Sequence, residues 1–80
     1  MFSQKTLLSK LPEIIGKLRD TYGSCYYSVN FIDDKLHISD GSDTINSDIV
    51  DTIKKVTEKQ EIPWEITISN DELVIVLGDE

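Results

Sequence analysis

The chain has 80 residues, of which 15 are acidic and 8 are Lys or Arg, and its formal net charge is −7 at pH 7. A chain of this length has room for one core, so we expect a single domain over residues 1–80. The acidic balance repels phosphate backbones and anionic lipid headgroups, which disfavours direct binding to nucleic acid or to a membrane surface.

The cysteine content and the hydropathy indicate the compartment. The only cysteine, Cys25, excludes a disulfide within the chain. Residues 1–10 lack the charged and apolar regions of a secretory signal, and no apolar run approaches the length of about 20 residues that a membrane-spanning helix needs. We therefore expect a soluble cytoplasmic protein that does not bind membranes.

The first predicted element is a helix from about Lys10 to Tyr22. Its apolar residues recur at spacings of three and four: Leu7, Leu8, Leu11, Ile14, Ile15, Leu18 and Tyr22. Pro12 fits the first turn of this helix, and Gly23 is its expected C-cap. Residues 3–9 are expected to form a preceding turn or a kinked segment.

Residues 27–39 alternate between apolar and polar side chains, which predicts a β-hairpin that turns at Asp33 and Asp34. A two-residue loop sets which residues lie opposite each other in the two strands. The expected inner face pairs Val29 with Ile38 and Phe31 with Leu36, and the outer face pairs Asn30 with His37 and Ser28 with Ser39.

The segment DGSDTINSDIVD, from Asp40 to Asp51, raises the question of a cation site. It matches several coordinating positions of an EF-hand loop, but Ile45 stands where that loop needs Gly, and Asp51 stands where it needs Glu. We expect no metal site here. The segment is better explained as the start of a second helix, with Ser47 as its N-cap. The apolar residues of this helix are Ile45, Ile49, Val50, Ile53 and Val56.

A second hairpin is predicted over residues 64–77, with its turn at Asn70 and Asp71. The expected inner face, taken as core, pairs Trp64 with Leu77, Ile66 with Ile75, and Ile68 with Leu73; the outer face pairs Thr67 with Val74 and Glu65 with Val76.

The second half of the sequence resembles the first. At an offset of 37 residues, Tyr27 aligns with Trp64, Val29 with Ile66, Phe31 with Ile68 and Leu36 with Leu73. We expect an α+β fold made of a duplicated αββ unit, with halves at about residues 1–40 and 41–80. The two halves would form a four-stranded antiparallel sheet with two helices on one face. The alternative is a chance likeness between two amphipathic hairpins.

The sequence offers few groups for catalysis. Cys25 and His37 are the only nucleophilic thiol and the only imidazole, and the strand alternation puts them on opposite faces of the sheet. One His and one Cys cannot supply a zinc site. We therefore expect a protein that is not an enzyme and has neither a cofactor nor a metal site.

Two groups of residues are candidates for binding a protein partner. Residues 1–32 carry four cations and two acids, whereas residues 33–80 carry thirteen acids and four lysines. The first candidate is an acidic patch of Asp33, Asp34, Asp40, Asp43, Asp48 and Asp51. The alternative is that these acids form a solvated surface that keeps the protein soluble.

The second candidate is the outer face of the sheet, because both helices are expected on the opposite face. Its residues are Asn30, His37, Glu65, Thr67, Val74 and Val76, for contact with a partner or with a second copy. The alternative is a central strand that tolerates two exposed valines.

These patterns favour a small protein-interaction module that binds a protein partner with a basic surface. An inhibitor that mimics nucleic acid, of the kind found in phages and mobile elements, is one form of this function. The alternative is a structural or assembly module that forms a homodimer through the open sheet face.

Overall fold

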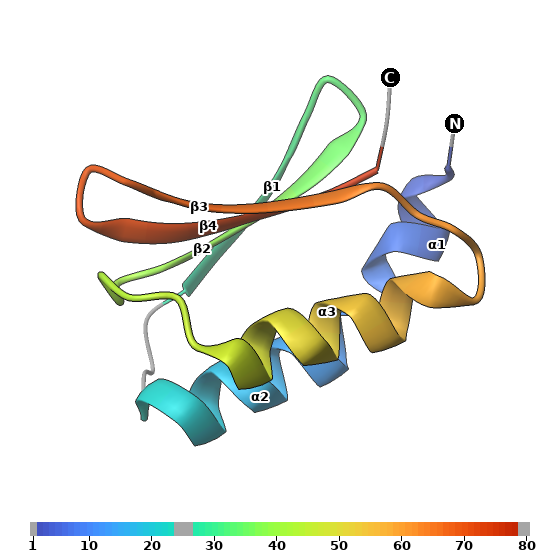
Figure 1. The fold of residues 1–80 in the computed structure, drawn as a ribbon. Coiled ribbons are helices and arrows are strands. Elements are labelled where there is room, and N and C mark those ends of the chain that lie inside the picture. Colours follow the sequence, from blue (N-terminus) through green and yellow to red (C-terminus); the bar gives the residue numbers. More distant parts are fainter. Residues whose placement is uncertain (1, 24–26, 79–80) are drawn as a thin grey trace.

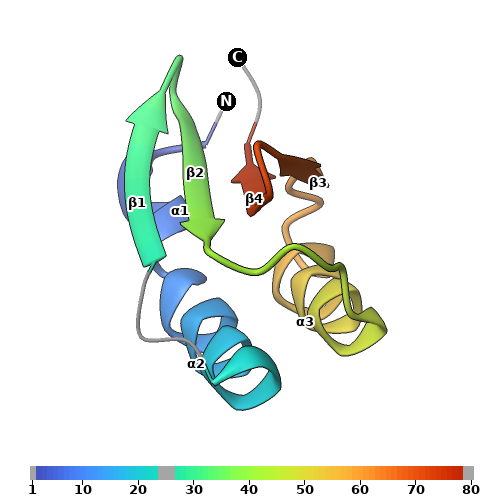
Figure 2. The ribbon, with the colours of Figure 1, turned by 90° about the vertical axis from the view of Figure 1, so that its left-hand side faces the viewer.

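The computed structural model describes residues 2–23 and 27–78, and it contains a four-stranded antiparallel sheet. Helices α2 and α3 lie side by side on one face of this sheet, and none of the described helices covers the other face (Figures 1 and 2). In chain order the elements are α1 (Gln4–Leu8), α2 (Leu11–Tyr22), β1 (Tyr27–Ile32), β2 (Lys35–Asp40), α3 (Ser47–Glu58), β3 (Trp64–Ser69) and β4 (Glu72–Leu77). The predicted α+β class is confirmed.

The predicted break before the first long helix separates two helices. Ser3 caps α1, because its hydroxyl accepts a hydrogen bond from the Thr6 N–H at 3.1 Å. Pro12 lies in the first turn of α2, where its missing N–H removes no helical hydrogen bond. Gly23 ends α2 at a φ of 65°, and its N–H donates to the Arg19 carbonyl.

The N-cap of α3 is Asn46 rather than the expected Ser47. The Asn46 side-chain oxygen accepts from the Asp48 N–H at 2.8 Å, whereas Ser47 is already helical. Ile45, expected as the first apolar residue of the helix, precedes it and is 44% exposed. The first buried residue of the helix is therefore Ile49.

A tyrosine fixes the segment that leads into α3. The Tyr22 hydroxyl, at the end of α2, donates to the Thr44 carbonyl at 2.7 Å and accepts from the Asn46 N–H at 3.0 Å. The two long helices are therefore joined by hydrogen bonds as well as by packing.

Both hairpins have the predicted turns and register. Asp33, Asp34, Asn70 and Asp71 all have a φ between 52° and 65°, as a type I′ turn requires. The turn conformation matches the twist of the flanking strands, and the register follows from it. Every inner-face and outer-face pair predicted within the two hairpins is present.

The strand order is β1-β2-β4-β3, so β2 and β4 are central and β1 and β3 are the edges. In the central antiparallel pair, Leu36 lies opposite Leu77, and Asp40 lies opposite Leu73. At the offset of 37 residues, Leu36 corresponds to Leu73 and Asp40 corresponds to Leu77. The repeat therefore converts the first of these pairs into the second. The register is thus compatible with a repeat at that offset, and the duplication of an αββ unit stays a prediction.

The core lies between the helices and the central strands. Its buried apolar residues are Leu7, Ile14, Ile15, Leu18, Leu36, Ile38, Ile49, Ile53, Val56, Ile62, Leu73, Ile75 and Leu77. None of the helices within residues 2–23 and 27–78 is long and apolar enough to span a membrane.

The edge strands differ from the predicted core. Phe31 and Trp64 are only partly buried, and Ile68 is 36% exposed. An edge strand has a neighbouring strand on one side only, so the outer flank of its inner-face side chains stays open. The prediction that Ile68 belongs to the core is therefore wrong.

Candidate functional site

The six acids of the predicted patch do not form one surface. Asp33 and Asp34 form the turn before β2, whereas Asp43, Asp48 and Asp51 follow β2 at its other end (Figure 1). A strand the length of β2 (Lys35–Asp40) spans about 20 Å, since each residue advances about 3.3 Å. All five of these side chains are exposed, but they lie in two groups.

Asp40, the sixth acid of the set, is buried. It is 3% exposed and lies on the inner face of β2 between Tyr27 and Leu73, and neither carboxylate oxygen has a hydrogen-bond partner among the described residues. The expectation that it contributes to a surface patch is wrong. The strand alternation contained the signal, because Leu36 and Ile38 point inward and Asp40 continues their parity.

The end of the sheet near Asp40 is acidic and slightly hollow. The central register brings the β3–β4 turn, with Asp71 and Glu72, to the same end as the segment that follows β2. A hollow of about 250 Å³ is lined there by Tyr27, Ser28, Ser39, Asp40, Gly41 and Glu72. Within the described residues, no group of three or more His, Cys, Asp or Glu side chains could hold a metal ion.

The outer sheet face brings its six predicted residues together. Asn30, His37, Val76 and Glu65 form one row across the four strands, and Thr67 lies opposite Val74 in a neighbouring row. The two valines and His37 are half-buried, and the other three side chains are exposed. The predicted relation of His37 to Cys25 lies outside the described residues.

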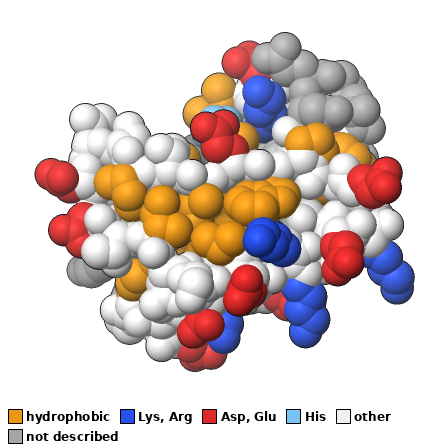
Figure 3. Space-filling view, viewed as in Figure 1, with side chains coloured by type: hydrophobic (Ala, Val, Ile, Leu, Met, Phe, Trp, Pro, Cys, Tyr) orange, Lys and Arg blue, Asp and Glu red, His pale blue; other side chains and the backbone are white. Residues whose placement is uncertain are grey.

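A further surface, which sequence reasoning assigned to the core, lies between β3 and α3. The inner-face side chains of β3 are Trp64, Ile66 and Ile68, of which the first two are partly exposed and the third is 36% exposed. Figure 3 shows a hydrophobic band that runs across this side of the molecule, between the strand and the helix. We call this surface the β3–α3 groove. Only the strand order could have revealed it, because the side chains themselves are typical of a core.

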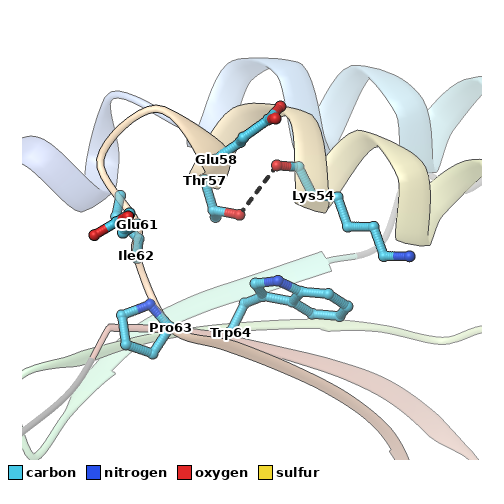
Figure 4. A pocket seen from close by; sticks show the side chains of 7 residues that line it. All are labelled: Lys54, Thr57, Glu58, Glu61, Ile62, Pro63 and Trp64. Carbon is cyan, nitrogen blue, oxygen red and sulfur yellow. Dashed lines mark hydrogen bonds between the residues drawn. The ribbon is translucent and has the colours of Figure 1, made fainter.

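The groove deepens at its Trp64 end into a hollow of about 680 Å³. Its lining residues, drawn in Figure 4, are Lys54, Thr57, Glu58, Glu61, Ile62, Pro63 and Trp64.

The last turn of α3 shapes this hollow. The Thr57 hydroxyl donates to the Ile53 carbonyl at 2.7 Å, and the Thr57 carbonyl accepts from the Ile62 N–H at 3.1 Å. Glu61, just before Ile62, has a φ of 53°, which is the left-handed position of a Schellman motif. This ending turns the chain sharply into β3 and places Trp64 beneath the helix.

The backbone of β3 is also available along the groove. Gly78 N–H donates to the Pro63 carbonyl at 2.8 Å, which fixes which residues of β3 bond to β4. Because antiparallel partners alternate, Glu65 and Thr67 direct their N–H and C=O groups toward β4, whereas Trp64, Ile66 and Ile68 direct theirs away. Among the described residues, β4 is the only strand that pairs with β3.

Acids and lysines both lie beside the groove. Glu58, Glu61 and Lys54 line its hollow, and Glu65 and Lys35 line a second hollow beside Trp64. From the start of α3 to the start of β4, residues 47–72, the acids are Asp48, Asp51, Glu58, Glu61, Glu65, Asp71 and Glu72, and the cations are Lys54, Lys55 and Lys59. Seven acids against three lysines leave this segment with a net charge of −4. The groove thus combines an apolar floor with a border in which three acids, Glu58, Glu61 and Glu65, outnumber two lysines, Lys35 and Lys54.

The chain was compared with models of protein families, with curated proteins and with solved structures, and none of the three comparisons found a match.

Proposed function

We propose that the protein is a non-enzymatic interaction module that binds a protein partner with a basic surface. The observation that carries this proposal is the β3–α3 groove, where partly exposed and exposed apolar side chains lie beside Glu58, Glu61 and Glu65, which outnumber the lysines there. Apolar contact in a desolvated groove supplies most of the affinity of such a complex, and complementary charge supplies the association rate and the choice of partner. An inhibitor that covers the phosphate-binding surface of a nucleic-acid enzyme falls within this class.

A charge-matched capture experiment tests the proposal. The protein is immobilised and exposed to a cell extract, and captured proteins are quantified by mass spectrometry at about 50 mM and about 200 mM salt. We expect capture of basic proteins that falls severalfold at the higher salt. The variant Glu58→Gln with Glu65→Gln should lower capture further, because it removes two carboxylates of the groove border.

The control variant is Glu13→Gln with Asp20→Asn, which makes the same change in net charge on exposed positions of α2. Capture by this control should stay close to that of the unmodified protein. The proposal would be contradicted if the amount of captured protein were the same at both salt concentrations, or if it fell equally in both variants.

A second candidate function is self-association through the outer sheet face. The observation that favours it is the position of Val74 and Val76 on a face that none of the described helices covers (Figure 2). In this alternative the acids keep the assembled protein soluble.

A further inference from the structure

We propose that an extended basic segment of the partner adds to the free edge of β3 as a fifth strand. This inference rests on the proposed function and specifies how the partner docks. The apolar side chains of the added segment lie in the β3–α3 groove, and its Lys or Arg side chains lie against the acids of the border.

The backbone provides the first part of the site. Trp64, Ile66 and Ile68 direct their N–H and C=O groups away from β4, so the strand presents a ladder that only another strand satisfies fully. Peptides that add a strand to a sheet gain main-chain hydrogen bonds from such an edge and gain specificity from pockets for alternate side chains.

The same three residues provide the second part. Their side chains point to the inner face, so every residue that offers hydrogen bonds at the edge also offers apolar surface in the groove. In an added strand, the residues that face α3 would cover this surface, and the first of them would enter the hollow beside Trp64.

Charge decides which occupant fits. Glu65 lies on the outer face of β3, where an added strand would place a side chain directly opposite it. Glu58 and Glu61 lie at the Trp64 end of the groove, where Lys54 is the one cation that lines the hollow. A second copy of this chain would bring its own negative charge to the same edge, whereas a basic segment would neutralise the border.

The other edge strand shows the contrast. β1 (Tyr27–Ile32) also directs an apolar inner face toward a helix, but its sequence YSVNFI contains no charged residue. It belongs to residues 1–32, whose four cations and two acids give a charge of +2. A basic segment therefore favours β3 over β1.

A short synthetic peptide tests the docking mode. The probe is a blocked peptide of about seven residues in which Lys and Val alternate, the pattern of a strand with one basic and one apolar face. Trp64 is the only tryptophan of the chain, so its fluorescence reports on the groove directly. We expect saturable binding with a blue-shifted Trp64 emission and with slower hydrogen exchange of the Ile66 and Ile68 amides.

Two variants address the two kinds of contact. Ile68→Lys puts a cation on the apolar floor, and Glu65→Lys reverses the charge that faces the added strand. We expect each to weaken binding of the probe by about tenfold, which corresponds to about 1.4 kcal/mol. Glu65 is exposed, so this variant stays informative if Ile68→Lys destabilises the fold.

The matched controls are Asp20→Lys, which makes the same charge change on α2, and Tyr27→Lys, which makes the corresponding change on the exposed inner-face residue of β1. Both should alter the affinity by less than about twofold. A peptide in which Glu replaces Lys should not bind.

The results separate this inference from the proposed function. Binding that depends on salt but leaves the Trp64 emission and the β3 amides unchanged would overturn strand addition at β3 and keep a basic partner. Saturation of the groove by a second copy, seen as concentration-dependent protection of the same amides without peptide, would also overturn it. Failure of any basic peptide to bind, together with failure of capture from extract, would overturn both.

Discussion

Asp40 is a buried carboxylate in a position that is costly for the fold. Its carboxylate loses its hydration on burial, and no described residue gives it a hydrogen bond in exchange. The cross-strand neighbour of Asp40 on β4 is Leu73. In the predicted repeat, the position of Asp40 corresponds to that of Leu77, which is fully buried. An apolar side chain of similar size therefore suits this site better than the native one.

We predict that Asp40→Leu stabilises the protein by about 1–3 kcal/mol, the usual cost of an unsatisfied buried polar group. For a domain of this size each kcal/mol raises the melting temperature by roughly 4–8 °C. Thermal and urea unfolding, followed by circular dichroism, would measure the change.

The control for this prediction is Asp43→Leu, at an exposed loop position, which should change stability by less than about 0.5 kcal/mol. Binding of the Lys-Val peptide should be the same for Asp40→Leu as for the unmodified chain, because the exposed border is intact. A lower melting temperature for Asp40→Leu would mean that the native carboxylate is compensated after all.

At the scale of elements, the two long helices depend on Tyr22. Its hydroxyl bonds to a carbonyl and to an N–H of the segment that enters α3, so one side chain from α2 sets the start of the next helix. Asn46 then caps that helix from an extended conformation. The groove depends on this arrangement because α3 forms one of its walls.

We predict that Tyr22→Phe lowers the free energy of unfolding by about 1–3 kcal/mol, since two hydrogen bonds of about 0.5–1.5 kcal/mol each are lost. Urea unfolding measures the loss, and faster hydrogen exchange at the Asn46 amide locates it. Tyr27→Phe, at an exposed position of β1, is the matched control and should have little effect. An unchanged Asn46 amide would show that the Tyr22 bonds do not hold the segment in solution.

The strands follow a simple division of roles. The central strands β2 and β4 carry inner-face leucines and isoleucines that are fully buried. The inner-face apolar side chains of the edge strands β1 and β3 are partly buried or exposed. Stability is therefore concentrated in the middle of the sheet. A partner strand added at the edge of β3, as proposed, would therefore leave the core intact.

At the scale of the whole molecule, charge separates the two halves of the chain. Residues 1–32 carry +2 and residues 33–80 carry −9, and the acidic part includes α3, β3 and the turn after β3. A net charge of −7 opposes association of two copies and favours association with a basic protein. The proposed function therefore predicts a monomer when no partner is present.

We predict that light scattering after size exclusion gives the mass of one chain over a concentration and salt series. A dimer that persists at all salt concentrations would favour the second candidate function. In that case, Val74→Asp with Val76→Asp should restore the monomer, whereas Thr67→Asp, on the exposed edge of the same face, should change the mass less.

The sequence by itself determined the local structure, because local structure depends on residues that are close in the chain. Apolar spacing predicted both long helices, and Gly23 predicted the end of the first. The type I′ turns set the register of each hairpin, and the parity of Leu36 and Ile38 already pointed Asp40 inward.

Only the tertiary structure decided how the two hairpins pair. Their inner faces carry the same apolar pattern, so the pattern alone does not say which strands are central; that choice depends on packing between segments far apart in the sequence. The pairing of β2 with β4 made β3 an edge strand, exposed Ile68 and opened the groove beside α3. The candidate site is a consequence of strand order, which no local pattern encodes.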